Sequence, residues 1–551
     1  MNSFNKEFEK IRNNMIFKWL CIPMTVLVIL TAGASYNLFA YFQQIGAAQG
    51  YGPATMTTIK YTVLIGYYLG LIPGYIVRAF SPMGSFIIAG LMALISFVGL
   101  GYITNNGDGS TLYWIFMILF LFIGAISGAL ATVAAFVTTV KSFPRLASIL
   151  IIVIMIAYYK VAPYLEFSMR TAFVSEDVDL MWYFIGVGCV MAVIFFAAAG
   201  VIREVTFADK VEQMMQSQDR AGLLVYVFIE VLFLGAFYVI SLIYEEWTIG
   251  AWLFIAVIII NFIAVGIVAY IVAASLRKEM KELLKSSSKD KREKLSFEEM
   301  LGRPKYIALV FATFFAVGIT STYGFNIFQI AFSYEVIDNA DHFLDTFWAA
   351  DVFSRFLGGL FAYFFINSFN GYRWAFWSAV GGAFGFGFAM LTPAIGATML
   401  FASTIAIGFC AGMFWVLVPS IIMEDAGEED FGLNWGLTLF ANVLGIVFFG
   451  EMFDWIYEWQ GEGPKCSGGN CVMIQFISFG ILLLFAAGLC YYALGKDIED
   501  GKKNKKDNKP KKDDKKKPDR SGRSGDKSGR SKSKDKKRES KKKSRSKSNR
   551  K

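Results

Sequence analysis

The sequence is poor in the residues that many enzymes use for chemistry. Histidine occurs once among 551 residues, at His342, so a histidine-based triad and a histidine-rich metal site are excluded. The chain also lacks a glycine-rich Gly-Lys loop of the kind that binds phosphate in nucleotide hydrolases. We therefore expect no enzymatic activity, no cofactor, no metal site and no direct use of ATP.

Charged residues are scarce along most of the chain and gather at its C-terminal end. The residues from Lys496 onward hold 27 Lys/Arg and 10 Asp/Glu, whereas the first 495 hold 26 Lys/Arg and 34 Asp/Glu. Residues 495–551 contain no aromatic side chain, so we predict a disordered basic tail. It could contact anionic lipid headgroups or simply stay solvated, and no nucleic acid is expected because no aromatic stacking groups are interleaved.

Long apolar runs make up most of the remaining sequence. Hydrophobic residues are 55% of the chain and the mean hydropathy is +0.48. Since a helix needs roughly 20 apolar residues to cross a bilayer core, the runs predict an all-α polytopic membrane protein with about fourteen transmembrane helices. The predicted spans are 16–44, 58–79, 82–103, 112–140, 146–165, 180–202, 221–244, 249–274, 305–333, 344–366, 373–392, 396–424, 431–453 and 473–494.

The positions of the basic residues predict the orientation, because cytoplasmic loops are enriched in Lys and Arg. With the N-terminus in the cytoplasm, only Arg170 and Lys465 of the first 495 residues fall outside, and Lys60, Lys160 and Arg355 lie within spans. We therefore expect both termini to be cytoplasmic, in the plasma membrane or an organelle membrane. A removable leader is not expected, because the first apolar run is too long for one.

An internal similarity predicts how the helices are grouped. The first span carries GASYNLFAYFQQI at 33–45, and the ninth carries TSTYGFNIFQI at 320–330. Secondary transporters are commonly built from two related bundles, so we expect six-helix bundles at 16–202 and 305–494. The remaining segments are then a cytoplasmic N-terminus (1–15), a linker with two inserted helices (203–274) and an amphipathic cytoplasmic connector (275–304).

Four stretches carry a resemblance to a known family. They are SYNLFAYFQQIGAAQGYGPATM, GYYLGLIPGYIVRAFSPMGSFIIAG, VTTVKSFPRLAS and DVFSRFLGGLFAYFF. Through them the chain resembles the fourteen-helix major facilitator superfamily, with the nodulin-like and oxalate/formate-antiporter-like branches nearest. That resemblance implies a secondary transporter, a symporter or antiporter, that works by alternating access. The chain departs from the family at the turn after the second helix, where Val77 and Arg78 stand without an acidic residue.

Charges within the membrane are the best guide to a site, because each costs at least about 2.5–3.5 kcal/mol at the bilayer centre. Asp351 and Arg355 are separated by one helical turn in the span 344–366. Asp351 could hold Arg355 in place while some of its donors remain free for a substrate carboxylate. The pair is similar to the substrate and proton site of the monocarboxylate-transporter branch. It could instead be a self-neutralised pair that stabilises helix packing.

Two further charged residues, Lys160 and Glu230, could each have a functional or a structural role. Lys160 could be a second anion contact, or it could extend towards the membrane interface as Lys60 is expected to do. Glu230, in the first inserted helix, could carry a proton or could contact a helix of the first bundle.

Polar residues of the two related helices complete the predicted substrate site. They are Tyr36, Asn37 and Gln43 in the first bundle, and Tyr323, Asn326 and Gln329 in the second. Each could equally form a hydrogen bond between helices. Cys466 and Cys471 lie in a predicted outward loop, where they could form a disulfide if that side is oxidising.

These observations predict a secondary active transporter of a small organic anion, a mono- or dicarboxylate, with or without protons. The alternatives are a transporter of amino acids or of another small metabolite, and a membrane sensor or scaffold that no longer transports. The expected partners are the substrate and membrane lipids. The sequence does not predict the oligomeric state.

Overall fold

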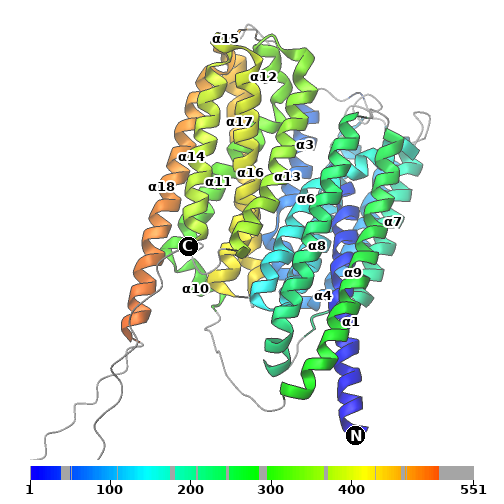
Figure 1. Cartoon of the computed structure of the whole chain (residues 1–551). Coiled ribbons are helices and arrows are strands. Elements are labelled where there is room, and N and C mark those ends of the chain that lie inside the picture. The colour runs from blue at the N-terminus through cyan, green and yellow to red at the C-terminus, as the bar shows by residue number, and fades with distance from the viewer. Residues whose placement is uncertain are drawn as a thin grey trace, which may run out of the picture. The chain divides into compact units, whose positions relative to one another are not determined.

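The computed structural model describes residues 2–38, 50, 53–107, 109–173, 180–205, 209–243, 247–283, 295–364, 370–427, 430–460, 466 and 468–507. The chain divides into two compact units, Met1–Asp500 and Gly501–Lys551. Among the described residues the regular elements are all helices (Figure 1). The expected all-α class is therefore confirmed.

The first group of helices comes from the N-terminal part of the chain. Its members are α1 (Asn2–Tyr36), α3 (Pro53–Tyr68), α4 (Leu71–Asn106), α5 (Thr111–Lys141), α6 (Arg145–Phe173) and α7 (Leu180–Val201). Helix α4 packs against α5 and α7, while α1 packs against α5 and α6. Two long helices follow, α8 (Asp209–Ile243) and α9 (Trp247–Leu283), and they lie against α6 and α1.

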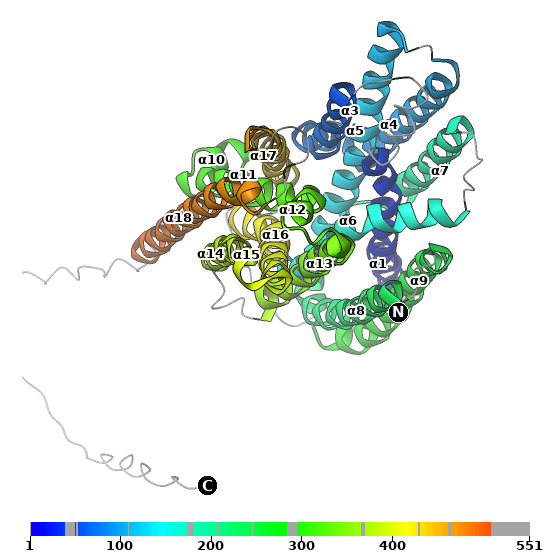
Figure 2. The same cartoon turned by 90° about the horizontal axis from the view of Figure 1, so that it is seen from above.

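The second group of helices begins after the short helix α10 (Phe297–Leu301). Its members are α11 (Pro304–Phe325), α12 (Ile327–Ser333), η2 (Ile337–Asn339), α13 (Ala340–Phe364), α14 (Gly371–Met390), α15 (Thr392–Ile395), α16 (Ala397–Ala426), α17 (Phe431–Gln460) and α18 (Asn470–Asp507). Helix α16 packs against α13 and α14, and α17 packs against α11. The two groups meet where α13 and α16 contact α6 and where α17 contacts α3, α4 and α5, as the view from above shows (Figure 2).

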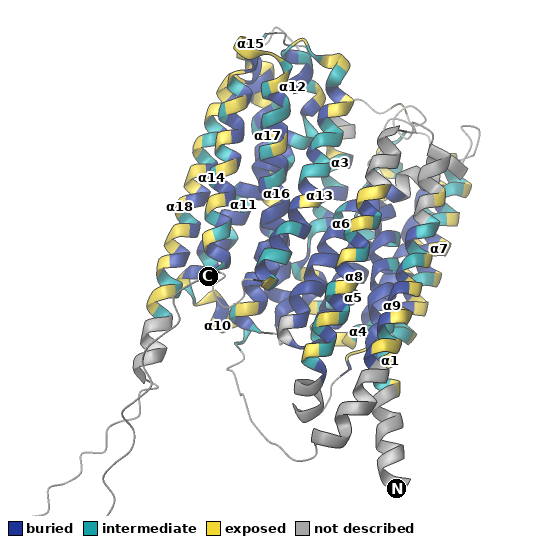
Figure 3. Cartoon of the chain, viewed as in Figure 1, coloured by how far each residue is buried: buried dark blue, intermediate teal, exposed yellow. Residues whose placement is uncertain are grey.

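Nine helical segments of the described residues are long and apolar enough to cross a membrane, judged by length and composition. Large apolar side chains are exposed on several helices, such as Trp377 and Phe384 on α14 and Ile481 and Phe485 on α18. Figure 3 shows exposed residues along the helices α14 and α18. Apolar residues on outer faces suit contact with lipid. The multi-pass architecture is thus confirmed, whereas the number of fourteen spans stays a prediction.

Two predicted spans are interrupted by local backbone geometry. The predicted span 58–79 is divided, because α3 ends at Tyr68 and α4 begins at Leu71. Helix α4 then runs on to Asn106 and bends at Ser81, where φ is 64°. Pro82 follows, and a proline disfavours the helical conformation in the residue before it. The sequence predicts a break between the second and third spans at residues 80–81, and the non-helical residue Ser81 lies at that break.

The predicted span 305–333 is also broken. Helix α11 ends at Phe325, and Asn326 leaves the helical region with φ −105° and ψ 18°. Its side-chain amide donates to the Thr322 carbonyl oxygen at 2.9 Å, which satisfies a helix-terminal acceptor. Interrupted membrane helices with a bonded backbone are typical of transporter cores.

The predicted connector 275–304 differs from expectation at its start. Helix α9 continues through residues 275–283, so this stretch extends the second inserted helix. At its other end, α10 has a capping box formed by Ser296 and Glu299, and the Phe297 backbone N–H donates to Asp430 Oδ2 at 2.8 Å. The end of the connector is thereby attached to the start of α17. The tail beyond Asp507 lies outside the described residues.

Candidate functional site

The strongest cluster of charge in the membrane region is on α13. Arg355 Nε donates to Asp351 Oδ1 at 2.7 Å, and Arg355 Nη2 donates to Asp351 Oδ2 at 3.3 Å. Both residues are 1% exposed. The i,i+4 spacing within one helix places the two side chains on one face, and the two bonds use the planar fork of the guanidinium.

A third charged residue joins this pair from another helix. Lys160 on α6 places Nζ 2.9 Å from Asp351 Oδ2, with its side chain 22% exposed. Its ammonium also lies 4.1 Å from the ring centroid of Trp348, within the range of a cation–π contact. Two cations therefore share one carboxylate, and the cluster carries one net positive charge.

Arg355 also bonds directly to the backbone of α6. Its Nη1 donates to the Ile156 carbonyl oxygen at 2.8 Å. Ile156 precedes Lys160 by one helical turn, so Asp351 and Arg355 both bind the same stretch of α6. This stretch belongs to the N-terminal group of helices and α13 to the C-terminal group, so the charge cluster bridges the two groups.

Aromatic side chains enclose the cluster on one side. The Arg355 guanidinium lies 5.2 Å from the ring centroid of Trp415 on α16. Tyr68 and Tyr159 each lie 5.8 Å from Trp415, measured between ring centroids. Tyr159 stacks on Tyr67 at 5.3 Å, which continues the aromatic wall towards α1. These rings present polar hydroxyl groups on largely apolar bodies, a lining suited to small organic molecules.

Small residues allow the helices to approach this closely. A Cβ atom at Gly412 of α16 would collide with the main-chain oxygen of Asp351 and with Ser354. A Cβ atom at Gly359 of α13 would collide with the side chain of Val153 on α6. Both contacts depend on glycine, because any other residue would push α13 away from its neighbours.

The other predicted site residues are only partly brought together. Tyr36 joins the aromatic wall, with its ring 5.3 Å from Tyr67, and Asn37 donates to the Pro163 carbonyl oxygen at 2.5 Å. Tyr323 instead shares a 2.7 Å hydrogen bond with Thr404 inside the second group. Asn326 lines a small pocket with Lys60, and Gln329 is half-buried on α12. Gln43 lies outside the described residues.

Glu230 lies in a separate buried network. Tyr158 of α6 donates to Glu230 Oε2, and Asn261 of α9 donates through Nδ2 to Tyr158 Oη at 2.9 Å. Tyr226 donates to Asn261 Oδ1. The network therefore joins the two inserted helices, α8 and α9, to α6. Glu230 contacts a helix of the first group, which was one of its two predicted readings.

Outside the membrane core, Cys466 and Cys471 are joined by a disulfide, with their Cα atoms 5.9 Å apart. The Tyr457 hydroxyl donates to the Cys466 carbonyl oxygen at 3.1 Å. Cys466 is therefore bonded to α17. The remaining four cysteines are free.

The aromatic wall was missed by the sequence reasoning. Tyr67, Tyr68, Tyr159 and Trp415 are each uncharged, and none of them was part of the paired-helix motif. The available signal was the repeated Tyr-Tyr sequence, at 67–68 and 158–159. Two adjacent tyrosines within an apolar run place a hydroxyl group on more than one helix face, which requires polar partners on both.

Comparison with known proteins gives matches of two kinds. The family described as Nodulin-like matches residues 18–272. A probable transporter MCH1 of Yarrowia lipolytica is 30% identical over 95 residues, which are 16% of this chain and 20% of that protein. A probable transporter MCH1 of Wickerhamomyces anomalus is 34% identical over 71 residues, 13% of this chain and 14% of that protein. The chain thus matches one fifth or less of the length of these curated relatives.

Solved structures give broader coverage at low identity. The proton:xylose symporter XylE, bound to 6-bromo-6-deoxy-D-glucose, is 16% identical with a TM-score of 0.48, over 89% of this chain and 96% of that chain. The fucose:proton symporter FucP of E. coli is 14% identical with a TM-score of 0.43, over 85% of this chain and 98% of that chain.

Proposed function

We propose that this chain, whose residues 18–272 match the family described as Nodulin-like, is a secondary active transporter of a small organic anion. The observation that carries the proposal is the sharing of Asp351 by Lys160 and Arg355. A buried site with one uncompensated positive charge is costly when empty, because desolvation penalises the charge. A carboxylate that enters the site supplies the missing negative charge and the bidentate geometry that Arg355 prefers.

The same three residues offer a route to proton coupling. When Asp351 takes up a proton, its ion pairs with Lys160 and Arg355 weaken, and both cations become available to the substrate carboxylate. The proton and the anion then enter together. They leave together when Asp351 loses the proton and pairs again with Lys160 and Arg355. Lys160 is the partner that moves, because its side chain is partly exposed and it contacts Asp351 through one oxygen.

Alternating access follows from where the cluster lies. Asp351 and Arg355 bind residues 156–160 of α6, so the cluster fastens one group of helices to the other. Substrate binding competes with these bonds and lets the groups rock against each other. The charge cluster thus has two roles: it binds the anion, and it holds the two groups of helices together.

Uptake into proteoliposomes tests this function. Labelled mono- and dicarboxylates are offered under an imposed pH gradient to the native chain, to Arg355→Ala and to Lys160→Gln at matched reconstitution. Arg373→Ala is the matched control, since Arg373 is exposed on α14. We expect saturable uptake by the native chain and by Arg373→Ala, and its loss in Arg355→Ala.

Two results would contradict the proposal. Uptake of amino acids or sugars, with no uptake of simple carboxylates, would reject the anionic substrate. A folded native chain that transports none of these compounds would favour a sensor or scaffold. An Arg355→Lys variant with the same folding and stability as the native chain would support that reading.

A further inference from the structure

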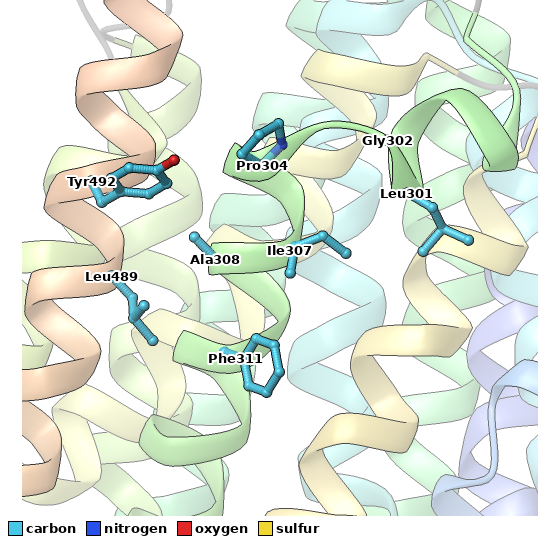
Figure 4. Close-up of a pocket in the computed structure, with 8 residues that line it drawn as sticks. All are labelled: Leu301, Gly302, Pro304, Ile307, Ala308, Phe311, Leu489 and Tyr492. Carbon is cyan, nitrogen blue, oxygen red and sulfur yellow. The ribbon is translucent and has the colours of Figure 1, made fainter.

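An apolar groove opens on the outer surface between α10, α11 and α18, with a volume of about 430 Å³. Its walls include Leu301, Ile307, Phe311, Leu489 and Tyr492. In the close-up view the Tyr492 ring extends from α18 across the groove towards Pro304 (Figure 4). The groove is separate from the charge cluster around Asp351, to which none of its lining residues belongs.

The position of the groove determines what can fill it. Helices α11 and α18 are both candidate membrane spans, and groove residues face outwards, with Phe311 55% and Tyr492 48% exposed. Pro304 and Phe311 both line the groove and are seven residues apart, so the groove runs roughly 10 Å along α11 at about 1.5 Å per residue. An open apolar groove of this length on an outward-facing surface fits part of an acyl chain.

One end of the groove carries two basic residues, Arg303 and Lys496. Lys496 follows Tyr492 by one turn of α18, and its Nζ lies 5.8 Å from the Tyr492 ring centroid. Arg303 stands between the lining residues Gly302 and Pro304 and is partly exposed. Lys305, by contrast, is held by Asp425 and Asp497 at 2.8 Å each, so its charge is already balanced.

The geometry points to a binding site for an anionic phospholipid. One acyl chain lies in the groove, and Arg303 and Lys496 hold the phosphate at its end. Lys496 is bonded to Glu499 at 3.0 Å, but both side chains are exposed, and such surface pairs give way readily to a competing anion. Tyr492, aromatic with a polar tip, then lies at the boundary between chain and headgroup.

Photo-crosslinking in reconstituted membranes tests this site with the full chain. Phosphatidylglycerol and phosphatidylcholine carry the same diazirine-labelled acyl chain, and labelled peptides are mapped by mass spectrometry. The variants are the double substitution Arg303→Gln/Lys496→Gln and the matched control Arg373→Gln, which removes an exposed charge of α14 that does not line the groove. Phosphatidylcholine labelling also reports whether each variant keeps the groove.

We expect phosphatidylglycerol to label the peptides that contain Phe311 and Leu489 with roughly tenfold higher apparent affinity than phosphatidylcholine, since two basic residues favour the anionic headgroup. The double variant should lower the phosphatidylglycerol signal to that of phosphatidylcholine and leave the latter unchanged. Equal labelling by the two lipids would overturn the proposal. So would an equal loss in Arg373→Gln, or phosphatidylglycerol labelling confined to the basic tail.

Discussion

Arg355 donates a hydrogen bond at 2.8 Å to the backbone oxygen of Ile156, a residue 199 positions earlier in the chain. The same guanidinium binds Asp351 through two other nitrogens. One side chain therefore fixes an internal carboxylate and a distant helix at once. A rigid planar fork can make these three bonds together, whereas a single ammonium cannot.

Arg355→Lys should therefore reduce carboxylate uptake although it keeps the positive charge. Lysine can bind either Asp351 or the Ile156 carbonyl, but it lacks the bidentate geometry for a carboxylate. We expect transport to fall by roughly tenfold or more, which corresponds to the loss of at least about 1.4 kcal/mol. Initial uptake rates at matched protein density measure it. An unchanged rate would show that only the charge of Arg355 matters.

Asp351→Asn should destabilise the folded protein strongly. It leaves the buried Arg355 and the partly exposed Lys160 without their shared anion, and removing one member of a buried ion pair costs about 3–5 kcal/mol. The thermal unfolding midpoint in detergent should fall clearly. Adding Lys160→Met removes one of the two stranded cations, so the double variant should recover part of the loss. No recovery in the double variant would argue against the direct pairing.

Glu230→Gln should leave the pH dependence of uptake unchanged. The glutamine carbonyl can still accept the bond from Tyr158, so the network between α6, α8 and α9 is retained without the charge. Glu230→Ala removes that bond, and we expect a loss of about 1–3 kcal/mol in unfolding free energy. The checks are uptake as a function of pH and thermal unfolding. A flattened pH profile in Glu230→Gln would instead make Glu230 a proton carrier.

Gly359→Ala should destabilise the contact between α13 and α6, and Val153→Ala should restore it. The three atoms nearest to the added methyl group all belong to the Val153 side chain, and overpacking of this kind costs about 1–3 kcal/mol. Gly412→Ala is the matched comparison, because its methyl group meets the main-chain oxygen of Asp351 and Val153→Ala cannot relieve it. Thermal unfolding of the single and double variants compares the two sites. Rescue of both, or of neither, would contradict this account.

The sequence predicted those features that depend on local spacing. Asp351 and Arg355 are one turn apart, so their pairing follows from helix geometry alone. Membrane spans follow from the length of the apolar runs. The attachment of Lys160 to Asp351 could not be predicted, because 191 positions separate them and nothing local distinguishes a lysine that binds a carboxylate from one that extends to the interface.

Backbone irregularities were likewise hidden in the apolar pattern. The end of α11 at Asn326 and the division between α3 and α4 after Tyr68 interrupt runs whose hydropathy is continuous. Hydropathy reports how readily a segment partitions into lipid, and it is insensitive to the path of the backbone. The paired motif around Tyr36 and Tyr323 was also an incomplete guide, since Tyr36 joins the aromatic wall and Tyr323 bonds within its own group.

Helix α6 carries two sets of bonds on neighbouring residues. Ile156 and Lys160 bind α13, and Tyr158 between them binds Glu230 and Asn261 of the two extra helices. A rotation of α6 that separates Lys160 from Asp351 must therefore either stretch the hydrogen bonds of Tyr158 or move α8 and α9 together with α6. We therefore expect α8 and α9 to slow any movement of α6 that exposes the site, through bonds that lie outside the charge cluster.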